Sequence, residues 1–373
     1  MKLVKLILIL PYISNSYLFI YVYIFYKQLL VIRQSEIFRL SFLLVSPCHI
    51  LSPLAYLKGV RKGDKLMTKL FNREGAERLK NRVVGGESER GQRLAGGLLY
   101  QINALHSIDF FPDKKIEGLL LEQKKHDLKL LEEPIKLPEG LVRFSPSGVS
   151  KCRRDLYLKA MKSEKDEVLR YPYQRRWTRN ASAVHEAIQR DLLYCEKHLT
   201  DDLMFTVKRL DSGLPAWEEN IKKAKIIEYK GTKFVLYGMC DGLLEYKPDG
   251  TTVGFEFKTK STTLGAVGTY KLKEPASDHK AQATAYSLLF GVDEFIFVYE
   301  SLAKDGWLKG AEAKPDIRTF YHKVTEADKV ALLEKLKETA DAYYNKQIPD
   351  KETEKCMFCQ YKSACEKGGE SVE

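Results

Sequence analysis

Cysteine is scarce in this sequence: there are seven in 373 residues, an odd number, in a chain too long to depend on disulfides for stability. A secreted disulfide framework is therefore a poor fit. Glycine and proline are limited to 24 and 13 residues, and the chain is 44% hydrophobic and 11% aromatic, which argues against a collagen-like or disordered protein. The sequence contains no repeat of fixed period and no Gly-Lys-Ser/Thr phosphate loop, so we expect a globular protein of about two domains without its own ATP motor.

The charge balance is basic but uneven. Lys and Arg number 61 against 50 Asp and Glu, for a net charge of +11, which suggests nucleic acid or an anionic membrane as a partner. Residues 1–66 hold nine basic and two acidic residues, a net of +7, and the remaining chain carries only +4. Binding to DNA must therefore rest on local clusters of charge rather than on the total.

The amino-terminal segment has an uncharged run over residues 6–26, which is long enough to span a bilayer as a helix. A proline and a polar cluster interrupt the run, basic residues flank both of its ends, and no cleavage site follows closely. We favour the hypothesis that residues 1–66 are a translated leader and that the native start is Met67, because Lys62-Gly63-Asp64 can be encoded by a ribosome-binding sequence. A membrane anchor and a soluble apolar extension are the alternatives. We expect a cytoplasmic protein, bound to a membrane only if residues 1–66 are native.

Periodicity and turn residues predict a mixed α/β order after Met67. Residues 67–140 are predicted to be a helical region and linker, with Gly85-Gly86 and Gly96-Gly97 breaking helices and the stretch between them forming a flexible connection. Further helices are predicted over 145–161, opened by Ser145 or Ser147 as N-cap, and over 179–194, 278–291 and 325–347. Strands are predicted over 223–231, 232–247, 251–259 and 294–301.

Two carboxylates and a lysine lie on neighbouring predicted strands. Asp241 falls near the end of the second strand, while Glu256 and Lys258 are two apart on the third and so project from one face. Carboxylates bind Mg²⁺ or Mn²⁺, and a lysine beside them can orient an attacking water and offset phosphate charge. Each residue alone is more often a solvated surface group or a turn residue.

Other residues raise the significance of this set. Gln282 and Tyr286 are four apart and share one face of the next predicted helix, and His185 lies on the helix before the sheet. In this order, the helical histidine, G-x-x-D (238–241), E-x-K (256–258) and Q-x-x-x-Y (282–286) resemble the PD-(D/E)XK nucleases. The similarity covers about residues 145–366 and is greatest to the RecB-like branch, which includes AddB-type subunits and CRISPR-associated adaptation nucleases. Ala181 departs from the glycine that the family often has four residues before the histidine.

The resemblance implies a restriction-endonuclease-like core, a mixed sheet flanked by helices, over a nuclease domain of residues 141–373. It also implies a site: Asp241, Glu256 and His185 as metal ligands with the carbonyl of Phe257, and Lys258 positioning the water. Gln282 and Tyr286 would shape the site and contact DNA.

The ending C-x2-C-x5-C supplies three cysteines at spacing typical of a metal centre, Cys356, Cys359 and Cys365, and Cys152 is the best candidate for a fourth. Four thiolates can bind structural Zn²⁺ or a [4Fe-4S] cluster, and spacing does not separate the two. The resemblance favours the cluster, as a staple between the chain ends, because one cysteine before the core and three after it is the pattern of the family's iron-sulfur members. Cys195 and Cys240 are expected to be buried thiols.

A basic and aromatic cluster precedes the helical histidine. Tyr171 and Tyr173 alternate in it with Arg170, Arg175, Arg176, Trp177 and Arg179. Guanidinium groups on phosphates with rings under bases bind single strands. The alternative is that the aromatic rings pack inward and the arginines are only solvated.

The sequence therefore predicts a metal-dependent DNA nuclease, exonuclease or endonuclease, that acts on single strands or duplex ends in recombination, repair or phage DNA processing. A separate helicase or recombinase is a possible partner. The rival interpretations are a catalytically inactive accessory protein that binds DNA, and a membrane-anchored protein if the leader is real.

Overall fold

The computed structural model of the chain describes residues 89–368, which belong to one compact unit extending over Arg73–Glu373. The predicted leader, the Met67 start, Gly85-Gly86 and Cys48 lie outside the described residues. The described part of the chain begins with α4 (Glu89–Leu105), α5 (Lys114–Glu132), β1 (Arg143–Phe144), α6 (Arg153–Ala160), α7 (Pro172–His198), β2 (Phe205–Val207) and η2 (Glu218–Ile221). It continues with β3 (Lys223–Tyr229), β4 (Thr232–Gly238), β5 (Gly242–Tyr246), β6 (Thr251–Lys260), η3 (Leu264–Val267) and α8 (Ser277–Phe290). The last elements are β7 (Glu294–Ser301), η4 (Trp307–Glu312), β8 (Ile317–Lys323), α9 (Glu326–Tyr344), η5 (Thr353–Lys355) and α10 (Lys362–Glu366).

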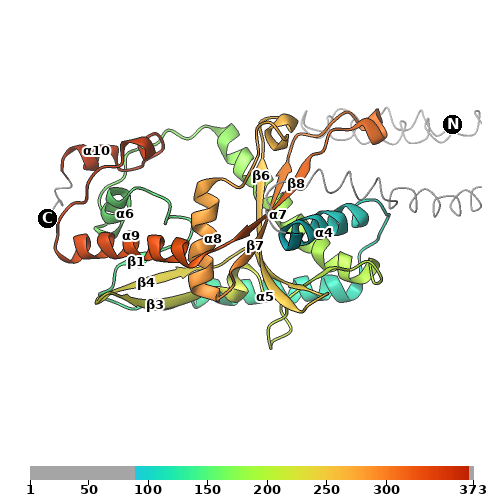
Figure 1. The fold of residues 1–373 in the computed structure, drawn as a ribbon, viewed down its shortest axis with the longest axis horizontal. Helices are drawn as coiled ribbons and strands as arrows, with labels where there is room; N and C mark the ends of the chain where they lie inside the picture. The colour runs from blue at the N-terminus through green and yellow to red at the C-terminus, as the bar shows by residue number, and fades with distance from the viewer. Residues whose placement is uncertain (1–88, 369–373) are drawn as a thin grey trace, which may run out of the picture. The chain divides into compact units, whose positions relative to one another are not determined.

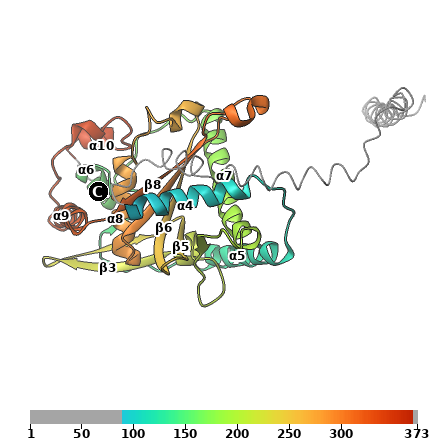
Figure 2. The same ribbon diagram turned by 45° about the vertical axis from the view of Figure 1, so that its right-hand side comes forward.

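A mixed five-stranded sheet in the order β2-β5-β6-β7-β8 forms the centre (Figure 1). Strands β6 and β7 are parallel, and the other neighbours are antiparallel. Figure 2 shows α8 on one side of this sheet and α7 with α4 on the other. A second sheet, β1-β4-β3, lies beside α8 and α9. This arrangement confirms the predicted α/β class with a mixed sheet flanked by helices.

The alternation of side chains along β6 separates the core from the site. Phe255 and Phe257 face α4 and α7 in a cluster that also contains Leu98 and Ile188. Side chains in between point to the opposite face, which is covered by α8. Glu256, which stands between Phe255 and Phe257 in the sequence, therefore points to the α8 face, where it is fully buried.

The predicted break at Gly96-Gly97 is wrong, because both glycines lie inside α4 and residues 89–97 are helical rather than a flexible connection. Gly97 is buried, and a Cβ at this position would lie 2.8 Å from the Met204 sulfur. Helix propensity alone predicts that Gly97 breaks the helix. The close approach of Met204, just before β2, explains why a glycine stands inside α4 instead.

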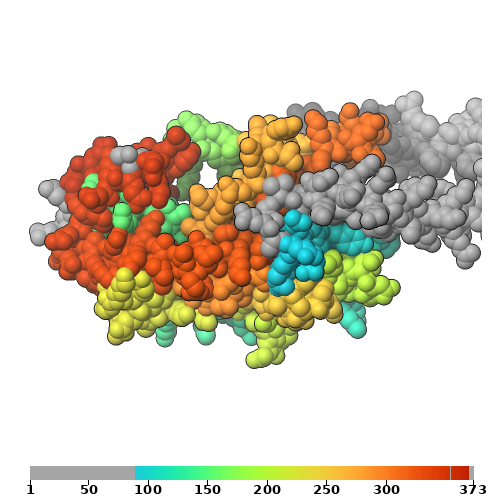
Figure 3. Space-filling model, in the orientation of Figure 1, coloured from blue at the N-terminus to red at the C-terminus, as the bar shows by residue number. Residues whose placement is uncertain are grey.

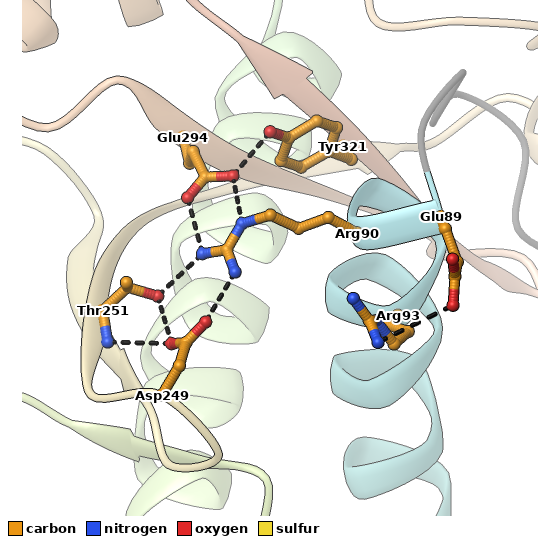
Figure 4. Close-up of polar contacts among 7 residues, drawn as sticks. All are labelled: Glu89, Arg90, Arg93, Asp249, Thr251, Glu294 and Tyr321. Carbon is orange, nitrogen blue, oxygen red and sulfur yellow. Dashed lines mark hydrogen bonds and ion pairs between the residues drawn. The ribbon is translucent and has the colours of Figure 1, made fainter.

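Arg90 fastens the start of α4 to the sheet (Figure 4). Its guanidinium donates to both oxygens of Glu294 at 2.7 Å, to Asp249 at 2.5 Å and to the Thr251 hydroxyl at 2.8 Å. Those three partners lie at the start of β7, in the β5–β6 turn and at the start of β6. Charge-assisted bonds to three segments anchor α4 to the central sheet.

Two further element predictions need correction. The helix predicted over 145–161 begins only at Arg153, with Cys152 rather than Ser145 or Ser147 at its N-cap, because residues 145–150 form turns. The strand predicted over 232–247 is two strands, β4 and β5, in different sheets, and Asp241 lies in the break between them. The helices α8 and α9 and the strands β6 and β7 match the predictions to within three residues at each end.

Among residues 89–368, no helix is both long and apolar enough to cross a membrane.

Candidate active site

Asp241 lies where the chain leaves one sheet for the other, and it is fixed from two sides. Strand β5 stops pairing with β6 at the Gly242–Phe255 pair, which leaves the backbone of Phe257 available. The Phe257 N–H donates to Asp241 Oδ2 at 2.7 Å, and the Gln189 side chain of α7 donates to the Asp241 carbonyl at 2.9 Å. The carboxylate is therefore presented at the exposed edge of β6.

Glu256 and Lys258 share the α8 face of β6. Glu256 is 0% exposed; its Oε1 pairs with the Lys258 ammonium, and its buried Oε2 has no hydrogen-bond partner in the described part of the chain. Burial, reinforced by the charge of Asp241, raises the pKa of Glu256 to about 8. Burial also acts to lower the pKa of Lys258, but the charges of Glu256 and Asp241 outweigh it and the net pKa is raised.

His185 approaches the same place from α7. Its ring stacks on Phe257 with centroids 5.8 Å apart, and its Nε2 lies 3.6 Å from Asp241 Oδ2. This Nε2 is buried and accepts or donates no hydrogen bond within residues 89–368. The other ring nitrogen, Nδ1, lies 3.3 Å from Glu218 Oε1. Burial, which is partly offset by His185, raises the pKa of that Glu218 carboxyl.

Gln282 and Tyr286 cover the site from α8. The Gln282 amide donates to the Tyr286 hydroxyl oxygen at 2.6 Å. The Tyr286 side chain is 3% exposed, and burial raises the pKa of its hydroxyl, so of this pair only the half-buried Gln282 reaches the surface. Gly238, the glycine of G-x-x-D, packs so closely against Pro146 that a Cβ at this position would lie 2.5 Å from the proline ring.

Three residues of the site carried no sequence assignment: Gln189, Glu218 and His279. His279 Nδ1 lies 2.6 Å from the Tyr299 hydroxyl, whose oxygen also accepts from the Ala276 N–H at 3.3 Å. Burial, with the nearby Lys258, lowers the pKa of His279 to about 4. His279 and Gln189 had local signals, since His279 stands three residues before Gln282 on α8 and Gln189 stands four residues after His185 on α7.

The structure brings the basic and aromatic cluster onto one exposed stretch of helix. Helix α7 begins at Pro172, earlier than predicted, so Arg175, Arg176, Trp177 and Arg179 lie on it and Arg170 just before it. All of these side chains are exposed, and Trp177 is 49% exposed. Tyr173 stacks on Tyr171 at 6.0 Å and meets Trp177 edge-on at 5.8 Å. Inward packing of the aromatic rings, the alternative interpretation, is therefore wrong.

The four candidate cluster cysteines come from two chain segments that lie side by side. Helix α10, near the carboxyl end, packs against α6, as the adjoining red and green atoms of Figure 3 show. The Glu352 N–H donates to Cys152 Sγ at 3.5 Å, and Cys356 Sγ donates to the Glu352 carbonyl at 3.8 Å. Cys359 and Cys365 flank α6 through contacts with Asp155 and Arg154, whereas Cys195 and Cys240 are buried, as predicted.

The donor atoms at Asp241 fit a divalent cation by their chemistry. Within residues 89–368, no three His, Cys, Asp or Glu side chains already surround a point at which a metal ion could be held. However, His185 Nε2 and Glu256 Oε2 are buried without partners, and buried polar atoms left in this way are costly. Carboxylate oxygen suits both Mg²⁺ and Mn²⁺, and imidazole nitrogen binds transition-metal ions rather than Mg²⁺, so an ion within reach of both atoms would satisfy them and the histidine favours Mn²⁺.

Comparison with known proteins identifies the family. Residues 151–366 match the sequence profile of the PD-(D/E)XK nuclease superfamily, and the chain belongs to that superfamily. It is thus a nuclease, a hydrolase of a superfamily whose members generally use Mg²⁺ or Mn²⁺. None of the curated proteins matches the sequence.

Solved structures show weaker similarity. The crystal structure of SSO0001 has 16% identity and a TM-score of 0.35, over 69% of this chain and 99% of that one. An alkaline exonuclease from Laribacter hongkongensis, LHK-Exo, has 11% identity and a TM-score of 0.34, over 55% of this chain and 90% of its own; its complex with dAMP has 13% identity and a TM-score of 0.32 over the same shares. The family assignment rests on the sequence profile.

Proposed function

We propose that the chain is a Mg²⁺- or Mn²⁺-dependent DNA nuclease, an exonuclease or endonuclease, whose catalytic residues are Asp241, Glu256 and Lys258. The observation that carries the proposal is the fully buried carboxyl of Glu256, with one oxygen against Lys258 and the other without a partner among the described residues. A buried acid and a half-buried amine beside a second carboxylate are costly for stability alone. At a site of phosphodiester hydrolysis the carboxylates can hold a metal ion, and the amine can orient water and offset the phosphate charge.

Each side chain has a task in direct attack by water, without a covalent intermediate. His185, Asp241, Glu256 and the Phe257 carbonyl would hold the ion, which supplies stabilisation of the charge that develops on the phosphate. Lys258, 24% exposed, orients the attacking water and offsets phosphate charge. Gln282, held by Tyr286, donates to the substrate at the α8 side.

The exposed start of α7 supports DNA as the substrate, taken as single strands or duplex ends. Arg170, Arg175, Arg176 and Arg179 provide charge for phosphates, and Trp177 an exposed ring for stacking on bases. His185 lies on the same helix, so a strand held at these residues is close to the proposed metal ligands.

The arrangement of cysteines supports membership of the RecB-like branch, with a [4Fe-4S] cluster at Cys152, Cys356, Cys359 and Cys365 as a staple of the domain over residues 141–373. Structural Zn²⁺ is the alternative for the same four thiols. The test is anaerobic purification of the full chain, followed by visible absorption and measurement of iron and zinc. Iron should be lost in Cys152→Ser and kept in Cys195→Ser, and a protein that contains neither metal would contradict the proposal.

The setting that fits this chemistry is DNA recombination, repair or phage DNA processing. Because the sequence has no phosphate loop, unwinding of a duplex would come from a separate helicase or recombinase.

The test of the nuclease is cleavage of labelled single- and double-stranded oligonucleotides by the full chain with Mg²⁺, Mn²⁺ or EDTA. Glu256→Ala and Lys258→Ala should each lower the rate by about 100-fold or more. Glu245→Ala, an exposed carboxylate on the neighbouring strand β5, should leave it unchanged. Activity that survives both site substitutions would refute the assigned site, and DNA binding without any cleavage would favour an inactive accessory protein.

A further inference from the structure

Glu218 adopts a backbone conformation that is costly for any residue except glycine. Its φ is +42°, in the left-handed region, and it opens the short helix η2 between the buried Trp217 and strand β3. A non-glycine residue in this region costs free energy and persists where the surrounding structure holds it there. Residues held in such conformations often occur at functional sites, which makes the Glu218 side chain a candidate for a functional role.

The surroundings of Glu218 fix its backbone next to the proposed metal site. The Glu218 N–H donates to the carbonyl of Cys240, the residue before Asp241, at 2.9 Å. Gln189 of α7, which donates to the Asp241 carbonyl at 2.9 Å, also bonds to the Glu218 side chain. The segment that carries Glu218 is thus tied to Asp241 through the backbone on one side and through Gln189 on the other.

The Glu218 carboxylate faces one nitrogen of His185 while the other nitrogen faces Asp241. Glu218 Oε1 lies 3.3 Å from His185 Nδ1, and His185 Nε2 lies 3.6 Å from Asp241 Oδ2. Both neighbours are carboxylates, which accept hydrogen bonds, but Glu218 is the nearer of the two, so a single ring proton is expected on Nδ1 and the lone pair on Nε2. Nε2 lies on the Asp241 side of the ring, and neither it nor Glu256 Oε2 has a hydrogen-bond partner among residues 89–368.

We propose that Glu218 is a positioning residue, which accepts the Nδ1–H of His185 and thereby selects the tautomer and ring orientation in which Nε2 binds the divalent ion. The proposal rests on the nuclease function and on His185 as a ligand. In metal sites of this kind, loss of the carboxylate behind a ligating histidine lowers metal affinity about 10- to 100-fold. Glu218 does not touch the reacting atoms and acts only through His185.

The strained backbone allows a test that separates this role from a purely structural one. Glu218→Gly relieves the strain at φ +42° but removes the carboxylate. If Glu218 positions His185, this variant should melt at the same temperature as the natural protein or higher, and still bind Mn²⁺ about 10- to 100-fold more weakly. If Glu218 only supports the fold, its removal should lower the melting temperature and leave the Mn²⁺ affinity of the folded protein unchanged.

Mn²⁺ affinity would be measured by electron paramagnetic resonance on the full chain without DNA, and the imidazole tautomer by ¹⁵N NMR, with His185 assigned from His185→Ala. Glu218→Ala should weaken Mn²⁺ binding and shift His185 toward a mixture of tautomers, and Glu218→Gln, which keeps an acceptor oxygen, should restore part of both. Glu219→Ala is the control, since the neighbouring Glu219 pairs with Lys222 at 3.0 Å instead.

Unchanged affinity and tautomer in both Glu218→Ala and Glu218→Gly would overturn the inference. This outcome differs from failure of the proposed function, in which the natural protein itself would not bind Mn²⁺ at a site sensitive to His185→Ala.

Discussion

Replacing Glu256 by glutamine should stabilise the metal-free protein, and by an amount that depends on pH. Burial and the charge of Asp241 raise the pKa of Glu256 from 4.5 to about 8 in the folded state. A carboxyl whose pKa is higher in the folded state than in the unfolded state contributes its full stabilisation at pH values below the unfolded-state pKa. This stabilisation is lost as the pH rises through the folded-state pKa. The loss in the natural protein should therefore occur between about pH 4.5 and pH 8.

The size of the effect follows from the shift. A pKa raised from 4.5 to about 8 corresponds to about 5 kcal/mol. This value is an upper limit on the gain in stability. In the variant, the Lys258 ammonium loses its charged partner and has only a neutral amide beside it, which offsets part of the gain. We expect Glu256→Gln to gain between about 2 and about 5 kcal/mol over the natural protein on going from pH 5 to pH 9.

The assay is denaturant unfolding of both proteins in EDTA at pH 5 and pH 9, with Glu245→Gln as the control for loss of an exposed carboxylate from the same sheet. With Mn²⁺ at pH 8 the order should reverse, because the ion favours the ionised carboxylate and stabilises only the natural protein. A stability difference between Glu256→Gln and the natural protein that is the same at both pH values would refute the reasoning.

Other substitutions test the fold and the DNA contacts. Arg90→Ala should cost about 1–3 kcal/mol in denaturant unfolding, because it leaves part-buried partners at the start of β6 and β7 without their donor, whereas Arg93→Ala removes only an exposed pair at 3.7 Å and should stay within about 0.5 kcal/mol (Figure 4). Gly254→Ala should cost about 1–3 kcal/mol by the same measurement, since its Cβ would lie 2.2 Å from the buried Phe295 ring; an unchanged midpoint would show that β6 and β7 are less tightly packed than described. The double substitution of Arg175 and Arg176 by alanine should lower the slope of log affinity for single-stranded DNA against log salt by about 1 to 2, and an unchanged slope would reject a role in DNA binding.

The elements around Glu256 could be predicted from the sequence because their signals are local. Alternation and flanking turns mark β6, and Gly291 and Thr325 mark the end of α8 and the start of α9, where the Thr325 hydroxyl accepts from the Asp328 N–H. The E-x-K and Q-x-x-x-Y motifs then follow from their spacing on these elements.

What could not be predicted depends on contacts between distant segments. Gly97 remains helical because of Met204, more than a hundred residues away, so propensity alone gave the wrong answer. The break that places Asp241 between two sheets interrupts a run that has uniform strand character in the sequence. Glu218 reaches the site only through the packing of η2, and no spacing along the chain relates it to His185, whereas Gln189 follows His185 by four residues on α7.

The central claim is that His185, Asp241 and Glu256 form the metal site of this nuclease. The most direct measurement is a crystal structure of the full chain with Mn²⁺ and a single-stranded oligonucleotide, with the ion located by its anomalous signal. We expect one anomalous peak for a Mn²⁺ ion bound by Asp241 and Glu256, with His185 Nε2 as a further ligand and Lys258 beside the phosphate. A peak that avoids these three residues, or no peak while the DNA is bound, would contradict it.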